Sequence, residues 1–170
     1  MATPQKEIRA KRGLASSFFD ERSGGFYIAQ EGHNYVAEEL EAAKILAHHG
    51  YRVVLAPEDG REGSGCFRLI ENKSPYAEGR IGSVWYEQYT PGVNGGGKNS
   101  IKNALWHAYE KGVPIALLYD KHGKTEGLNL EREIARHKGQ KKDYEDSVTR
   151  LILIKKHPTR NLWSVLDRTV

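Results

Sequence analysis

Two acidic side chains lie close to an aromatic stretch in the middle of the chain. Glu78 precedes a glycine, and Glu87 interrupts the aromatic run at 85–89, WYEQY. Carboxylates that converge from a turn and a strand end supply the oxygen ligands that Mg²⁺ and other hard cations prefer. A metal ion held in this way neutralises charge on a phosphodiester during cleavage and positions the attacking water. The pair therefore predicts a metal-dependent nuclease, with Mg²⁺ as the expected ion and Mn²⁺ or Zn²⁺ as alternatives.

A further carboxylate ligand is expected from a helix that precedes this stretch. Glu38 and Glu41 are separated by three positions, so they share one helix face. Each acid also has a simpler explanation: Glu87 on an edge strand would point to water, Glu78 in a turn would be solvated, and the helix acids would form a solvated face. A carboxylate buried on a central strand, by contrast, costs free energy unless it is paired or bound to a metal ion.

The segment after the aromatic run has the residue types that bind phosphate. Lys98 precedes a predicted helix, whose first backbone N–H groups favour an anion. The imidazole of His107, on the same helix, could act as a general acid or base. The alternative is a capped and solvated helix end. The residues predicted to contact nucleic acid are Gln88, Asn99, Ser100, Lys102, Asn103 and His107.

One glycine-rich segment imitates a nucleotide-binding loop. Residues 92–98, GVNGGGK, fit the GxxxxGK part of a P-loop. We reject this interpretation because Asn99 occupies the place of the metal-binding serine or threonine, and because Glu87 and Gln88 interrupt the preceding strand. The segment could still bind the backbone of a nucleic acid.

Composition limits the class of protein. The chain has 170 residues, 38% of them hydrophobic, and a net charge of +4 with a pI near 9.1, which suits an anionic partner. Cys66 is the only cysteine, which excludes an internal disulfide and a cysteine-based zinc site. No apolar run reaches the roughly 18 residues of a membrane span, and no secretory signal is evident. We therefore expect a cytoplasmic location and no membrane partner.

Hydrophobic patterning predicts an α/β fold. A basic, flexible arm is expected at 1–22, followed by a single domain at 23–170. Gly82-Ser83 between two apolar segments predicts a hairpin turn. The expected elements are a strand at 26–29, a helix at 35–49 closed by Gly50, strands at 51–56, 66–70 and 84–89, a helix at 101–111 capped by Asn99 or Ser100, a strand at 114–119, a helix at 128–137, and strands at 148–154 and 162–166.

This order gives an αβββαβ core, with a mixed central sheet flanked by helices and a C-terminal strand pair. Three segments within it, EELEAAKILAHHGYRVVLAPE, AEGRIGSVWYEQYTP and NSIKNALWHAYEKGVPIALLYD, resemble the C-terminal nuclease domains of contact-dependent growth-inhibition and other polymorphic toxins. Those domains belong to the PD-(D/E)XK superfamily. The resemblance covers about half of the chain. It implies cleavage of RNA, tRNA in particular, or of DNA, and an immunity protein as a partner.

The resemblance also implies roles for single residues. The first metal-binding acid falls on Glu78, the second on Glu87, and the helix glutamate on Glu41 or Glu38. The motif lysine falls on Tyr89, which departs from the family pattern. Lys98 or Lys102 could reach back into the site, Tyr89 could itself bind the phosphate or water, or the fold could have lost its activity. The last possibility makes an inactive module that binds nucleic acid or protein the second hypothesis.

Overall fold

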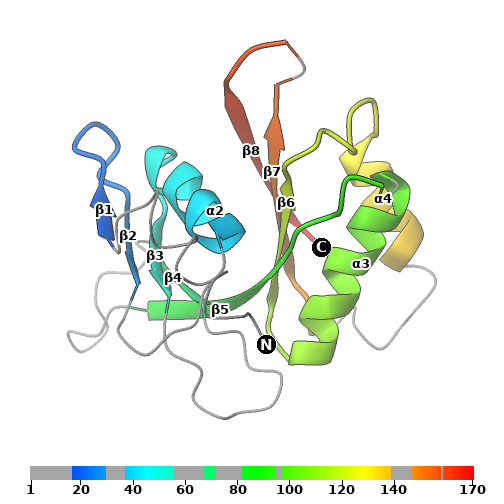
Figure 1. Ribbon diagram of the computed structural model, residues 1–170. Helices are drawn as coiled ribbons and strands as arrows, with labels where there is room; N and C mark the ends of the chain where they lie inside the picture. The colour runs from blue at the N-terminus through cyan, green and yellow to red at the C-terminus, as the bar shows by residue number, and fades with distance from the viewer. Residues whose placement is uncertain are drawn as a thin grey trace. The chain divides into compact units, whose positions relative to one another are not determined.

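The computed structural model describes residues 17–29, 37–55, 67–71, 82–94, 97–138, 147–157 and 159–170. Their Cα positions form two compact units, unit 1 up to Trp85 and unit 2 from Tyr86 onward. Both units combine helices with a mixed β-sheet, which confirms the predicted α/β class (Figure 1). The hydrophobic pattern of the sequence therefore predicted the right class of architecture.

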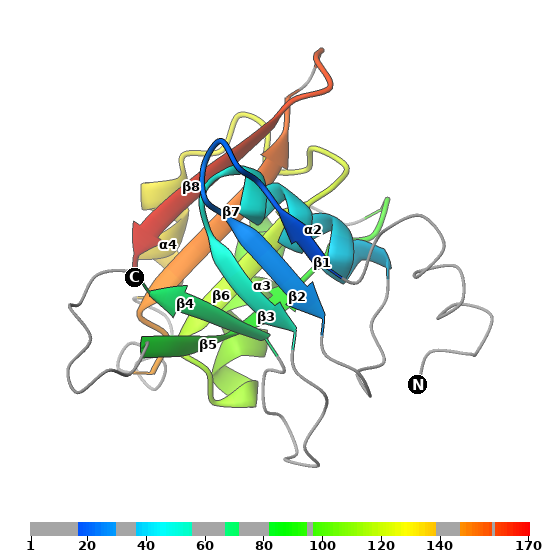
Figure 2. The same ribbon diagram turned by 90° about the vertical axis from the view of Figure 1, so that its left-hand side faces the viewer.

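Unit 1 is built around a parallel strand pair joined by a helix. Strand β2 (Phe26–Ala29) is parallel to β3 (Arg52–Leu55), and α2 (Ala37–His48) makes the connection. The outer strands β1 (Ser17–Phe19) and β4 (Phe67–Glu71) are antiparallel to their neighbours. Figure 2 shows α2 lying across one side of β1, β2 and β3.

Helix α2 forms because its apolar residues recur on one side and a glycine ends it. Leu40, Ala43 and Leu46 are fully buried, and Gly50 has a φ of +86°, which lets the chain leave the helix. The start of β2 approaches this helix end so closely that a Cβ on Gly25 would lie 1.9 Å from the carbonyl oxygen of Ala47. Only glycine fits between the helix end and the strand at this point.

Strand β1 was not predicted, because its residues lie in the segment expected to be an arm. The turn that joins it to β2 is closed by backbone hydrogen bonds in both directions between Asp20 and the Gly24-Gly25 pair, each 2.8 Å long. Ser23 adds a hydroxyl bond of 2.6 Å to the Asp20 carboxylate. A three-residue strand gives too little periodicity to be found by pattern, and its pairing with β2 supplies the missing stabilisation.

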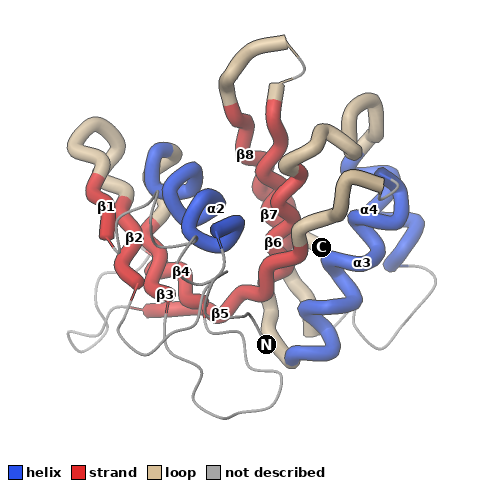
Figure 3. The backbone as a smooth tube through the Cα atoms, in the orientation of Figure 1, coloured by secondary structure: helices blue, strands red, loops and turns tan. Residues whose placement is uncertain are grey.

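Unit 2 contains a sheet in the order β5-β6-β7-β8. Strands β5, β6 and β7 are parallel, and β8 is antiparallel to β7. Parallel connections are right-handed, so the two helices that link successive strands lie on the same side of the sheet. Figure 3 shows these helices side by side along that face, and they contact each other. The elements are β5 (Gly82–Tyr89), α3 (Gly97–Lys111), β6 (Ile115–Asp120), α4 (Leu130–Lys138), β7 (Arg150–Lys156) and β8 (Trp163–Thr169).

The core of unit 2 follows from the central position of β6. All six of its residues are buried, as expected for a parallel strand with neighbours on both sides. Strand β7 buries 151–154, and α3 contributes Ile101, Leu105 and Ala108 to the packed layer. The polar residue Asp120 ends β6 within this core and is fully buried, so its hydrogen bonds must be supplied locally.

The order of elements from α2 to β6 is helix, three strands, helix, strand, as the sequence predicts. The predicted C-terminal strand pair is also confirmed, since β7 and β8 pair antiparallel and Arg150 binds Asp167 across them at 2.7 Å.

Two local predictions were wrong. Gly82-Ser83 belongs to strand β5 and makes no turn, and α3 begins at Gly97, so Asn99 and Ser100 lie inside its first turn and do not cap it. Within the described ranges, no helix has the length and apolar character that would be needed to cross a membrane.

Candidate functional site

Strand β5 presents the predicted Glu87-Gln88-Tyr89 segment beside α3. Tyr86 is buried, whereas the three following side chains are half-buried. Because side chains alternate across a strand, Glu87 and Tyr89 belong to one face of the sheet and Tyr86 and Gln88 to the other. Gln88 donates a 3.3 Å hydrogen bond to the hydroxyl of Thr90, its neighbour on that second face. The two predicted catalytic residues of β5 therefore share a face, and Gln88 does not share it.

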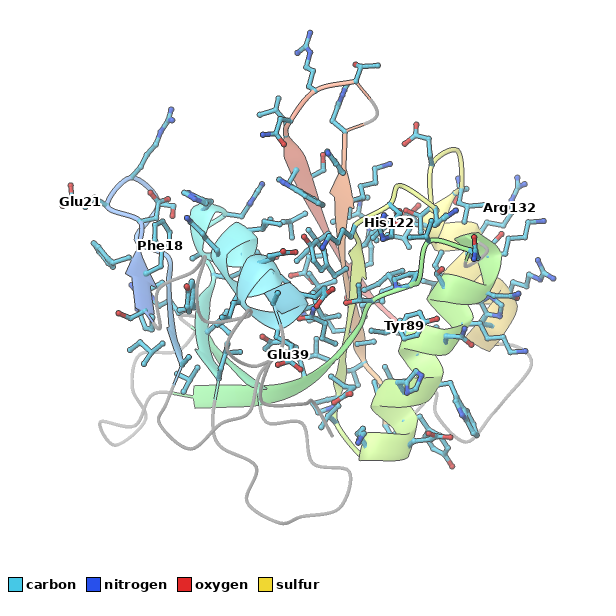
Figure 4. The ribbon with its side chains drawn as sticks, viewed as in Figure 1. Phe18, Glu21, Glu39, Tyr89, His122 and Arg132 are labelled. Atoms are coloured by element: carbon cyan, nitrogen blue, oxygen red, sulfur yellow. The ribbon has the colours of Figure 1, made fainter. Side chains whose placement is uncertain are left out.

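Tyr89 forms a cluster with two residues of α3. The side-chain amide of Asn103 donates a 3.2 Å hydrogen bond to the phenol oxygen, and the ring stacks on His107 with centroids 5.2 Å apart and planes inclined by 18°. Figure 4 shows Tyr89 at the side of α3. Asn103 and His107 are four positions apart, so one helix face carries both. The fold thus brings together three residues that the sequence assigned to the site.

This cluster holds the Tyr89 phenol in place through a hydrogen bond that does not involve the hydroxyl hydrogen. Asn103 donates to the phenol oxygen, so the hydroxyl hydrogen of Tyr89 can point elsewhere. Stacking against His107 restricts the ring to one plane. A half-buried hydroxyl held in this way can donate a hydrogen bond to a phosphate oxygen or to a water molecule. The neutral phenol supplies no positive charge.

The first turns of α3 hold the predicted phosphate-binding residues in different environments. Lys98, Asn99 and Lys102 are exposed, whereas Ser100 is 1% exposed and lies on the packed side of the helix. A substrate on the surface can reach the two lysines and Asn99. Ser100 contributes to the packing of the helix.

A tight backbone contact sets the start of α3. A Cβ on Gly97 would lie 1.9 Å from the carbonyl oxygen of Lys124, in the loop after β6. That loop is fixed by Asp120, whose carboxylate accepts hydrogen bonds from the N–H groups of Lys124 and Thr125 at 2.7 and 2.8 Å and from the Thr125 hydroxyl at 2.5 Å. The buried aspartate therefore positions the loop, and the loop limits where the helix can begin.

Sequence reasoning missed a buried acid–base pair on α4. Glu133 and His137 are 5% and 4% exposed, and Nε2 of the imidazole lies 3.7 Å from Oε2 of the carboxylate. Burial lowers the pKa of His137, Arg136 and Lys102 add to that shift, and Glu133 and the backbone of Lys98 oppose it. Their spacing of four positions on an amphipathic helix is the signal that could have identified the pair.

Three of the four predicted metal ligands lie in the described ranges. Glu78 lies outside those ranges. Glu38 and Glu41 are half-buried on α2 in unit 1, and Glu87 lies on β5 in unit 2. In the parts of the chain that the structure describes, no three His, Cys, Asp or Glu side chains form a group that could hold a metal ion. The metal site formed by Glu78, Glu87 and Glu38 or Glu41 therefore stays a prediction.

Comparisons with family models, with curated proteins and with solved structures give no match to this chain.

Proposed function

We propose that this chain binds a nucleic acid at the surface formed by β5 and α3 and hydrolyses its phosphodiester backbone. The observation that carries the proposal is the cluster in which Asn103 binds the Tyr89 phenol and His107 stacks on its ring. The cluster lies beside a helix whose exposed lysines, Lys98 and Lys102, suit a polyanion. RNA, tRNA in particular, is the substrate that the resemblance favours, and DNA is the alternative.

Each residue has a distinct task in this proposal. The two lysines attract the backbone, and the Tyr89 hydroxyl donates a hydrogen bond to a phosphate oxygen whose negative charge grows during the reaction. Glu87, on the same sheet face as Tyr89, accepts a proton from the attacking water or orients it. The bond that forms joins water oxygen to phosphorus, and the bond that breaks joins phosphorus to the leaving sugar oxygen. That oxygen takes up a proton from bulk water, which balances the proton that Glu87 accepts.

The test is incubation of the purified chain with total tRNA and with plasmid DNA, each with Mg²⁺, with Mn²⁺ and with EDTA. We expect cleavage that falls at least about 100-fold in Glu87→Gln, a loss typical of removing a general base. Glu110→Gln, which neutralises an exposed carboxylate on α3, is the matched control. The metal arms decide whether Glu87 works with a divalent cation. Equal cleavage by Glu87→Gln and the wild type would show that the site is misassigned.

Tyr89→Phe tests the phenol separately, because it keeps the ring that stacks on His107 and removes only the hydroxyl. We expect cleavage to fall at least about tenfold, since one hydrogen-bond donor to the reacting phosphate is lost. The variant should lose only about 1 kcal/mol of folding free energy, the usual contribution of one hydrogen bond. Full cleavage by Tyr89→Phe would remove the phenol from the mechanism.

A binding module without catalysis is the second candidate. It is favoured by Tyr89, which stands where the resemblance implies a cationic lysine and whose phenol oxygen accepts a hydrogen bond from Asn103. It predicts salt-dependent binding of nucleic acid with no cleavage under any metal condition. In that case Lys98→Ala should weaken binding and Glu87→Gln should leave it unchanged.

A further inference from the structure

The outer side of α3 carries two neighbouring stripes of different chemistry. At about 100° per residue, Lys98, Lys102, Trp106 and Tyr109 fall within an arc of about 80°. The second stripe, about a third of a turn away, contains Asn103 and His107 of the cluster described above. None of these side chains belongs to the buried set of the helix, which is Ser100, Ile101, Ala104, Leu105 and Ala108. A basic and aromatic stripe therefore runs beside an amide and imidazole stripe.

Aromatic rings occur in pairs on this surface. Trp106 and Tyr109 have centroids 5.3 Å apart with planes inclined by 39°, and Tyr89 stacks on His107 at 5.2 Å. All four rings are half-buried, neither sealed in the core nor fully in water. Tryptophan and tyrosine are enriched at interfaces, because their rings are apolar and carry a polar group that can stay in contact with water.

Nucleic acid presents flat partners to such rings only when its bases are unpaired. A duplex shows phosphates and base edges, whereas a single strand exposes base faces that stack on aromatic side chains. The lysines at the start of the first stripe match the charge of the backbone, and Asn103 can bind a base edge between the ring pairs. Flat rings interleaved with cations are therefore better suited to a single strand than to a duplex.

We propose that the α3 surface, defined as Lys98, Lys102, Asn103, Trp106 and Tyr109, binds single-stranded nucleic acid by stacking bases on Trp106. The inference rests on the proposed function, since it names the class of substrate that this surface presents to the β5–α3 site. It leads to a preference for loops, tails and unpaired stretches over continuous helix. It sets no preference between ribose and deoxyribose, because stacking and charge are common to both.

The experiment is a titration of labelled oligonucleotides into the full chain in EDTA, with tryptophan fluorescence and anisotropy as readouts. The probes are single-stranded RNA, single-stranded DNA of the same sequence, and the two matching duplexes. We expect either single strand to bind at least about tenfold more tightly than its duplex, with quenching of the tryptophan signal. Trp106→Ala should weaken single-strand binding about tenfold, the usual effect of one lost stacking platform.

Two variants separate stacking from a structural effect. Trp106→Phe keeps an aromatic face and should retain most of the affinity, whereas Trp163→Phe, on strand β8, serves as the control for an unrelated tryptophan. Equal affinity for duplex and single strand, or full binding by a folded Trp106→Ala, would overturn the inference. Cleavage of duplex in the nuclease assay would overturn it while leaving the nuclease intact. Single-strand binding that depends on Trp106, without cleavage under any condition, would uphold it and refute the nuclease.

Discussion

Replacement of Asp120 by asparagine tests whether the loop after β6 sets the position of α3. The aspartate is fully buried, and its two oxygens accept three hydrogen bonds from Lys124 and Thr125. The carbonyl of Lys124 in turn lies against Gly97, the first residue of α3. Asparagine has the same shape but replaces one acceptor oxygen by an amide that can only donate. The substitution therefore changes hydrogen bonding with almost no change of volume.

The magnitude follows from the bonds that asparagine cannot make. If the side-chain oxygen of the asparagine faces Thr125, both hydrogen bonds from Thr125 remain, in a weaker form without charge. The side-chain NH₂ then faces the backbone N–H of Lys124, and two donors cannot bond to each other. A bond to a charged group contributes roughly 1.5–3 kcal/mol and a neutral one about 1. The loss is reduced because the neutral amide is less costly to bury than the carboxylate. We expect a net destabilisation on the order of 3 kcal/mol.

Urea unfolding, followed by circular dichroism, measures this change in folding free energy. Thr125→Val is the comparison variant, since it removes only the hydroxyl bond and should cost roughly 1–2 kcal/mol. In a thermal melt, 3 kcal/mol corresponds to a fall of about 6–12 °C in Tm for a chain of this size. A free energy of unfolding for Asp120→Asn within about 0.5 kcal/mol of the wild-type value would refute the proposed role of the loop.

Three further predictions follow from the structure. Gly97→Ala forces a Cβ to within 1.9 Å of the Lys124 carbonyl and should cost roughly 1–3 kcal/mol in urea unfolding, whereas Gly92→Ala, with nothing within 4 Å, should be neutral. Gly112→Ala, at a φ of +69° with open space around it, should cost about 1 kcal/mol through backbone strain. Burial lowers the pKa of His137, so the unfolded chain binds its proton first and stability should decrease as the pH falls below about 6.5. Between pH 7.5 and 5, the urea midpoint should fall less in His137→Gln than in the wild type. An equal fall in both proteins would exclude this histidine as the cause of the pH dependence.

Local patterns in the sequence predicted most of the elements, because those elements depend on residues close together in the chain. The apolar face of α2 and the glycine after it identify a helix and its end, and both are found. The continuous apolar run of β6 identifies a buried strand, which is also found. Where the local signal was ambiguous, the prediction failed. Gly82-Ser83 is compatible with a turn and with an extended strand, and in the structure both residues belong to β5.

The sequence by itself also determined the chemistry that is available near α3. It places a carboxylate and a phenol two positions apart on one strand, and lysines, an amide and an imidazole at helical spacing on the next helix. Periodicity fixes which of these residues share a face within one element, since the strand repeats every two residues and the helix every 3.6. It does not fix which faces of different elements meet.

Only the tertiary structure decided which of these residues act together. It joined Tyr89 of β5 to Asn103 and His107 of α3, buried Ser100, and left Lys98 and Lys102 on the surface. It also buried Glu133 and His137 of α4, although their spacing of four positions is visible in the sequence. The physical reason is that contacts between elements depend on crossover handedness and on close backbone approaches such as that at Gly97. Such contacts join residues far apart in the chain, and no local window of sequence contains both partners.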